Sequence, residues 1–155
     1  MKNYSYKAKC DKNSTNQGEW VDGNLIICDN GDTLIVHAIK FNIRSMQIYR
    51  VIRETVCKIT DYVDKNDKNI SEGDILQSDN YPFLNDIGQR NYYGVVVWIN
   101  SGFYVETVRT SATSVRGCSE GNFESLSEFV EDNSAVEIIG NVLDNKYLLN
   151  PNYKY

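Results

Sequence analysis

The carboxylates between Asp64 and Leu76, in the stretch DKNDKNISEGDIL, are the residues whose types and spacing come nearest to a reactive site. An EF-hand calcium loop needs oxygen ligands at alternate positions, a glycine at the sixth position and a glutamate at the twelfth. Counting from Asp64 places Lys68 at a ligand position, and counting from Asp67 places Glu72 where the glycine is required. The spacing therefore argues against a calcium loop of this class.

Glu72 and Asp74 are close enough in sequence for a pair of catalytic acids, but such work needs a cleft and a shifted pKa, and the sequence predicts neither. Gly73 and Asp74 are typical turn residues ahead of a short apolar strand, Ile75–Leu76, and Asn66–Asp67 resembles a loop tip. We therefore interpret the stretch as a loop that enters a strand, and its acids as solvated.

The single histidine and the cysteines are the other candidates for chemistry. His37 lies within the strand-like run LIVHA, which favours a structural role, although a Cys–His pair stays open because such partners meet in space. The cysteines at positions 10, 28, 57 and 118 lack the spacing of a zinc site, and Cys28 and Cys57 lie in apolar runs. We expect reduced thiols, no metal, no cofactor and no enzymatic activity.

Charge is unevenly distributed along the chain of 155 residues, whose formal net charge is −5. Residues 1–58 carry a net +3 and residues 59–155 a net −8. A basic patch is predicted from Lys40, Arg44, Arg50, Arg53 and Lys58. The acidic remainder makes nucleic acid an unfavourable partner, because phosphate contacts need clustered lysine and arginine. No apolar run approaches the length of a membrane span and no signal sequence is present, so we expect a cytoplasmic protein.

Alternating apolar and polar residues predict a mainly β protein. EWVDGNLIICDNGDTLIVHAI reads as a hairpin turning at Asn30–Gly31, and YYGVVVWINSGFYVETV as a second hairpin, with a left-handed conformation at Gly102. Val95–Ile99 is apolar on both faces, which predicts a central strand. Further strands are expected at 39–44, SMQIYRVI, TVCKIT and AVEIIGNVL.

Helical patterns are confined to two short stretches. NFESLSEFVED places Phe123, Leu126, Phe129 and Val130 on one face of a helix, and DNKYLLN predicts a final turn before Pro151.

Aromatic residues gather on the second hairpin: Tyr92, Tyr93, Trp98, Phe103 and Tyr104. They could fill a small barrel, form a stacking platform for bases or ligands, or make a subunit interface. Together with the charge split, they lead us to expect a homo-oligomer.

The order of short motifs resembles the YopX family of phage and prophage proteins. The matching segments span nearly the whole chain: Gly18–Gly23, Glu54–Val56, Asp64–Asp67, Glu72–Ile75, Gly94–Val96, Glu137–Val142 and Asp144–Leu149. The resemblance implies a small, mainly β protein that self-assembles, with no established activity and no catalytic residues to transfer. It also identifies Trp20, Gly73, Asp74, Gly140 and Asn141 as structural signature positions.

These observations predict an N-terminal β meander over residues 1–50, beside a small SH3-like β-barrel over residues 51–155 with one or two short helices. The predicted function is a non-enzymatic interaction protein that binds or sequesters a host component, such as a defence protein. The alternative is a small-ligand or nucleic-acid-binding module that uses the aromatic hairpin.

Overall fold

Antiparallel strands make up most of the residues that the structure describes, as the alternating sequence pattern predicts. The computed structural model describes residues 6–38, 46–78, 92–110, 121–131, 136–149 and 155. The chain divides into two compact units, residues 1–59 and residues 60–155. The sequence pattern placed the boundary at residue 50. The boundary between the compact units lies further along the chain, because the segment after β4 packs back onto the first strand.

The N-terminal unit is built from strands that are neighbours in the order β4-β3-β2-β1-β5. A 3-10 turn, η2 (Arg53–Thr55), connects the last two strands along the chain. The strands are β1 (Tyr6–Lys9), β2 (Trp20–Ile27), β3 (Thr33–Ala38), β4 (Met46–Arg50) and β5 (Cys57–Val63), the last continuing into the second unit beside β6.

One face of this sheet supplies the core of the N-terminal unit. Ala8, Ile35 and Val51 are buried together, and Leu25 and Tyr49 pack against them. A bridge between Cys10 and Val51 joins the end of β4 to the end of β1. The main chain reinforces this contact, because Asp11 N–H donates to the Arg50 carbonyl at 3.0 Å and Ile52 N–H donates to the Lys9 carbonyl at 2.9 Å.

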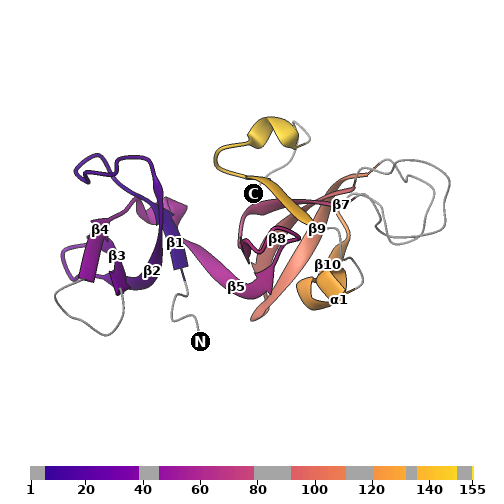
Figure 1. The fold of residues 1–155 in the computed structure, drawn as a ribbon, viewed down its shortest axis with the longest axis horizontal. Helices are drawn as coiled ribbons and strands as arrows, with labels where there is room; N and C mark the ends of the chain where they lie inside the picture. The colour runs from indigo at the N-terminus through magenta and orange to yellow at the C-terminus, as the bar shows by residue number, and fades with distance from the viewer. Residues whose placement is uncertain (1–5, 39–45, 79–91, 111–120, 132–135, 150–154) are drawn as a thin grey trace. The chain divides into compact units, whose positions relative to one another are not determined.

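The C-terminal unit contains a five-stranded sheet in the order β10-β9-β8-β7-β11 (Figure 1). The elements of this unit are β6 (Asn69–Ser71), β7 (Asp74–Ser78), β8 (Tyr92–Ile99), β9 (Gly102–Thr110), β10 (Phe123–Ser125), α1 (Leu126–Glu131), β11 (Glu137–Asn141) and η3 (Lys146–Leu148). Of these strands, β6 pairs with β5 and is not part of the five-stranded sheet. The predicted central strand is confirmed, since β8 lies between β7 and β9.

Both faces of β8 are covered, which explains its apolar sequence. Val96 belongs to a cluster that includes Tyr92 and Phe129, and Val95 belongs to a second cluster that includes Ile75 and Val142. Successive residues of a strand point to opposite faces, so adjacent valines fill two separate cores.

The closed barrel expected in residues 51–155 is not present among the described strands. The five-stranded sheet is open, with β10 and β11 at its edges. The sequence pattern identified strands correctly, but alternation along a strand carries no information about whether the first and last strands meet.

Two local predictions are also corrected. The helix begins at Leu126 rather than at Asn122, and Phe123 lies in β10 with its side chain 52% exposed. In the second hairpin the positive φ angles occur at Asn100 (50°) and Ser101 (66°), so Gly102 begins β9 in an ordinary strand conformation. Two adjacent positive φ angles suit the twist of a two-residue hairpin.

The other strand and turn predictions agree with the structure. The first hairpin turns at Gly31 with φ 87°, and DNKYLLN contains the 3-10 turn η3. The strand predicted at 39–44 lies outside the described residues, as do Lys40, Arg44 and Cys118. Within the described ranges, no helix combines the length and apolar character that crossing a membrane requires.

Candidate interaction surface

The outer face of β2, β3 and β4 carries aliphatic side chains that the core does not cover. Ile26 pairs with Leu34, and Val36 pairs with Ile48, so these side chains share the face opposite to Ile35 and Tyr49. Val36 is itself buried, at 5% exposure, and the exposed part of this face surrounds it. Ile26 is 45% exposed, Met46 43% and Ile48 61%. We call Ile26, Leu34, Met46 and Ile48 the outer apolar face.

Arg50, at the end of β4, is held by two carboxylates from different loops. Its Nε lies 3.1 Å from Asp11 Oδ2, and its Nη2 lies 2.5 Å from Asp32 Oδ1. The charge of this member of the predicted basic patch is therefore compensated within the protein. The interaction also fixes the loop that follows β1 against β4.

That loop is built by its own hydrogen bonds. Asp11 Oδ1 accepts from the Asn13 N–H at 2.8 Å, and the Gly18 N–H donates to the Cys10 carbonyl at 3.0 Å. Asn16 Nδ2 donates to Glu19 Oε2 at 2.6 Å. Between this loop and β4 is a groove of about 460 Å³, whose lining consists of Asn13–Asn16 on one side and Gln47–Arg50 on the other.

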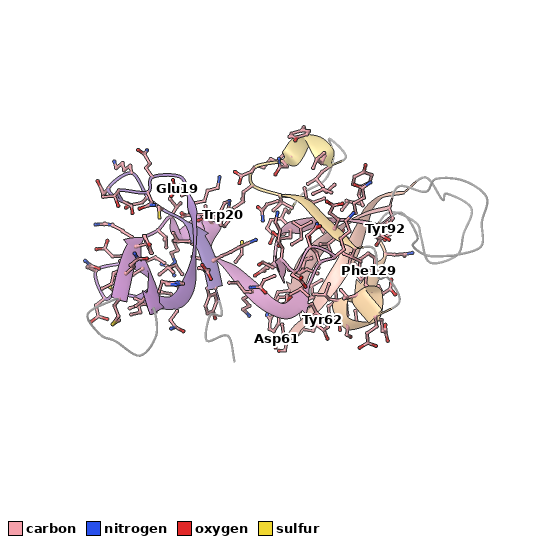
Figure 2. All side chains as sticks on the ribbon, in the orientation of Figure 1. Glu19, Trp20, Asp61, Tyr62, Tyr92 and Phe129 are labelled. Carbon is pink, nitrogen blue, oxygen red and sulfur yellow. The ribbon has the colours of Figure 1, made fainter. Side chains whose placement is uncertain are left out.

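Trp20 lies on a different part of the same unit and is enclosed by lysines from β1. Lys7 Nζ is 5.2 Å from the centre of its ring, and Lys9 Nζ is 5.5 Å away. Cation–π contacts of this kind attach the side chain of Trp20 to β1, with which β2 pairs (Figure 2). This signature tryptophan therefore fixes the start of β2.

The five aromatic residues of the second hairpin do not form one platform. Tyr92 is 1% exposed, and its ring centre is 5.3 Å from that of Phe129, so it belongs to the core (Figure 2). Trp98 and Phe103 pair edge to face at 4.6 Å on one face of the sheet. Tyr93 and Tyr104 occupy positions on the other face, because their cross-strand partners are Arg109 and Val97.

The predicted basic patch is only partly described. Arg50 is paired with acids, Arg53 is exposed in η2, and Lys58 lies on β5 opposite Tyr6. The arginines at positions 50 and 53 and the lysine at 58 therefore lie on three different elements, and the charge of Arg50 is compensated by acids.

The acids of residues 64–76 are bound to main-chain N–H groups. Asp64 is 4% exposed. Its Oδ1 accepts from Asn66 at 2.8 Å and from Lys68 at 3.0 Å, and its Oδ2 accepts from Ile138 at 3.1 Å. Burial raises the pKa of this carboxyl, but the three donors outweigh burial and hold the pKa below its usual value.

Asp74 is the second buried acid of the stretch. Its Oδ2 accepts from the Ser71 N–H at 2.8 Å, and its Oδ1 accepts from Asn141 Nδ2 at 3.2 Å. Asn141 in turn accepts from the Leu143 N–H at 3.0 Å. The sequence predicted solvated loop acids, and this prediction is wrong for Asp64 and Asp74, which are buried. Both carboxylates organise loops and strand ends through their hydrogen bonds.

The model of the YopX protein family matches residues 6–150 of this chain. The chain belongs to the YopX family. A search of curated proteins finds no match.

Apart from Trp20, the signature positions lie where the turn at Gly73 and the start of β7 meet the end of β11. Gly73 has φ 79°, its N–H donates to the Val96 carbonyl at 2.8 Å, and its carbonyl accepts from the Val142 N–H at 2.9 Å. A Cβ at Gly140 would lie 2.7 Å from Asn145 Oδ1. Two of the motifs are therefore in contact, although they lie 67 residues apart in the sequence.

The histidine, cysteine and acidic side chains of the described residues were the candidates for a metal site. No group of three or more His, Cys, Asp or Glu side chains there could hold a metal ion. His37 Nδ1 lies 3.1 Å from the Asp22 carbonyl oxygen, and Cys57 Sγ donates to the Thr55 carbonyl at 3.4 Å. Each of these side chains has a structural contact of its own.

The outer apolar face was not identified from the sequence, although a signal was present. In the strand sequence MQIYRV, apolar residues lie on both faces. Met46 and Ile48 point to one face, and Tyr49 and Val51 point to the other. A strand with one solvated face should alternate, so this pattern indicates a second contact surface.

Proposed function

We propose that this YopX-family chain is a non-enzymatic protein-interaction module, encoded by a phage or prophage, that binds or sequesters a component of the host cell. The observation that carries the proposal is the outer apolar face, and above all Ile48, which is 61% exposed on a strand at the edge of its sheet.

Edge strands in monomeric proteins are usually protected by lysine, proline or a bulge, because an exposed apolar edge promotes association. Met46–Arg50 contains no lysine and no proline, and its register with β3 is regular. Exposed apolar residues on neighbouring strands are typical of protein-binding surfaces. A protein partner is therefore favoured over a small substrate.

Capture from host lysate with the full chain tests this proposal when it is paired with two variants. Ile48→Asp should abolish capture of a specific host protein, because a carboxylate in an apolar interface is left without a partner. Phe123→Ser is the matched control, because Phe123 is a comparably exposed apolar residue on the other unit. Binding of the purified host protein that depends on Ile48 but not on Phe123 supports the proposal. Equal capture by all variants, or no specific capture, overturns it.

The Trp98–Phe103 pair favours a second candidate function, a small-ligand or nucleic-acid-binding module. Trp98 is 37% exposed near the end of the hairpin, where its ring packs edge to face with Phe103. The net −8 of residues 59–155 opposes phosphate binding, so weak and nonspecific binding at most is expected. Gel shifts near physiological salt test this candidate, with Trp98→Ala as the variant.

We also propose that the chain assembles with copies of itself in the cytoplasm of the bacterial host. The charge difference between the two parts of the sequence supports a head-to-tail contact, and the outer apolar face supplies area that exposed ion pairs alone lack. Light scattering coupled to size exclusion tests assembly, since a mass near the 17.7 kDa of one chain at all concentrations would refute it.

The sequence predicted an SH3-like barrel over residues 51–155. We propose instead that the SH3-like arrangement of strands belongs to the N-terminal unit. Its strand order β4-β3-β2-β1-β5, the turn η2 before β5 and the Cys10–Val51 bridge support this assignment. An experimental structure of the chain would test whether these strands close into a barrel.

A further inference from the structure

The residues that follow β1 pair with the end of β4, but the chain then turns away, so the rest of this edge of β4 has no neighbouring strand in the described structure. Cys10 bridges Val51, and the Asp11 N–H donates to the Arg50 carbonyl at 3.0 Å. Continued in the same register, the next residues after Asp11 would lie beside Tyr49 and Ile48. The chain instead turns away through Lys12–Gly18, and the groove opens between that loop and Gln47–Arg50.

The register shows which main-chain groups line this groove. The Val51 N–H donates to the Thr33 carbonyl at 2.9 Å, so Val51 directs its main-chain groups toward β3. In an antiparallel ladder the direction alternates from residue to residue. Tyr49 and Gln47 therefore also face β3, while Arg50 and Ile48 face the groove, as the bond from Asp11 to Arg50 independently shows. Ile48 offers both its N–H and its carbonyl to an incoming strand.

The opposite wall of the groove is polar and held in place. Asn13, Ser14, Thr15 and Asn16 line it, and the contacts of Asp11 with Asn13 and Arg50 fix the loop relative to β4. Arg50 is already bound by Asp11 and Asp32, so the groove presents no open site for an anion.

These features favour a single extended peptide segment over a second folded sheet. The loop wall stands beside β4 and would obstruct the broad edge of another sheet, whereas one strand needs only the width of the missing position. At about 3.3 Å per residue, the four residues Gln47–Arg50 would accommodate about four residues of peptide.

We propose that the groove between Asn13–Asn16 and β4 binds an extended, uncharged peptide segment of a partner protein by β-strand addition. Main-chain hydrogen bonds to Ile48 provide the attachment. An apolar side chain of the peptide packs on Ile48, and hydroxyl or amide side chains face the loop. This inference rests on the proposed interaction function and names the site and partner chemistry within it.

The test uses the full chain labelled with ¹⁵N and a panel of blocked heptapeptides in which threonine alternates with valine, isoleucine or tyrosine. Binding by strand addition should shift the amide signals of Ile48 and of Asn13–Asn16, and should protect the Ile48 N–H from hydrogen exchange. N-methylation of the peptide at alternate residues adds a direct check. One set of methyl groups should abolish binding, and the other set should be tolerated, because only every second N–H points at β4.

Ile48→Pro removes the main-chain N–H that faces the groove. The hydrogen bonds between β4 and β3 stay intact, because the main chain of Ile48 takes no part in them. Binding should weaken at least about tenfold, which corresponds to about 1.4 kcal/mol. Ile48→Thr keeps the N–H and serves as the matched control. If the proline variant loses its fold, as reported by Trp20 fluorescence, Ser14→Trp replaces it, because this change fills the groove from the loop and leaves β4 unaltered.

Signal shifts at Ile48 and the loop, with sensitivity to one methylation set, support the inference. No binding by any peptide of the panel, shifts centred on Trp98 and Phe103, or equal tolerance of both methylation sets would overturn it. A host protein that still binds the full chain through the outer apolar face would then leave the proposed function standing, so the two failures are distinguishable.

Discussion

The carboxylate of Asp74, at the start of β7, accepts a hydrogen bond from the side-chain amide of Asn141, at the end of β11, at 3.2 Å. These residues are 67 positions apart, and both are buried, at 2% and 7% exposure. The contact joins two of the motifs on which the resemblance to the YopX family depends, Glu72–Ile75 and Glu137–Val142. Four predictions follow from this and related contacts in the C-terminal unit, where Trp98 provides a fluorescence signal when Trp20 is replaced by Phe.

Asp74→Ala should lower the free energy of unfolding of the C-terminal unit by about 1–3 kcal/mol. The change deprives the buried Ser71 N–H and the Asn141 amide of this acceptor. Urea unfolding followed by Trp98 fluorescence measures the effect. Asp61→Ala, at an exposed position, is the control and should be nearly neutral; equal losses in both variants would contradict the role assigned to Asp74.

Lowering the pH should destabilise the C-terminal unit through Asp64. Its folded-state pKa lies below the usual value, so its contribution is present above about pH 4, the pKa of an unfolded aspartate, and is lost as the pH falls through the folded pKa. Asp64→Asn should show a weaker dependence on pH in this acidic window. Unfolding curves from neutral pH down to the acid range measure it, and an unchanged slope in the variant would count against the prediction.

Gly73→Ala should destabilise the unit more than Gly121→Ala does. Both glycines have positive φ, 79° and 83°, so each substitution carries a similar backbone cost of about 1–2 kcal/mol. Only at Gly73 would the new Cβ meet neighbours, with Val142 and Tyr155 atoms at 3.3 Å, whereas nothing lies within 4 Å at Gly121. Thermal or urea unfolding compares the two variants; equal losses would show that packing around Gly73 adjusts freely.

Tyr92→Phe and Thr107→Val should each be destabilising, and their combination should cost less than the sum. The Tyr92 hydroxyl and Thr107 Oγ1 are 2.7 Å apart and buried, so removing either one deprives the other of this partner. Each single change should cost about 1 kcal/mol. A double-mutant cycle measures the coupling, and strictly additive effects would show that the hydrogen bond makes no net contribution.

Much of the secondary structure could be predicted because it depends on local chemistry. The alternation around Thr33–Ala38 and the apolar run Val95–Ile99 predicted strands that the structure contains. The turn at Gly31 and the loop tip at Asp67, with φ 60°, followed from residues that tolerate a left-handed backbone. The acids of residues 64–76 were predicted to be solvated, and burial of Asp64 and Asp74 was not foreseen.

Tertiary structure alone decided which of the predicted surfaces are covered. A period of two determines which side chains share a face of a strand, but it does not determine what lies against that face. The sequence therefore left open whether Tyr92 fills a core or lies on an interaction surface, and the structure places it in the core, where Phe129 reaches it from α1. Phe123 was assigned to the apolar face of a helix and is exposed, because the pairing of β10 with β9 delays the start of the helix to Leu126.

The exposed edge at Ile48 likewise depends on contacts between distant segments. The sequence determines that Met46–Arg50 is an apolar strand, but only the bridge from Cys10 to Val51 determines where the neighbouring strand ends. The hydrogen-bonding groups of a strand are the same in every sequence, so their availability depends on which segment lies beside them. For this protein, the amino-acid sequence determined the strands and turns, and long-range pairing determined the buried carboxylates, the open sheet and the groove.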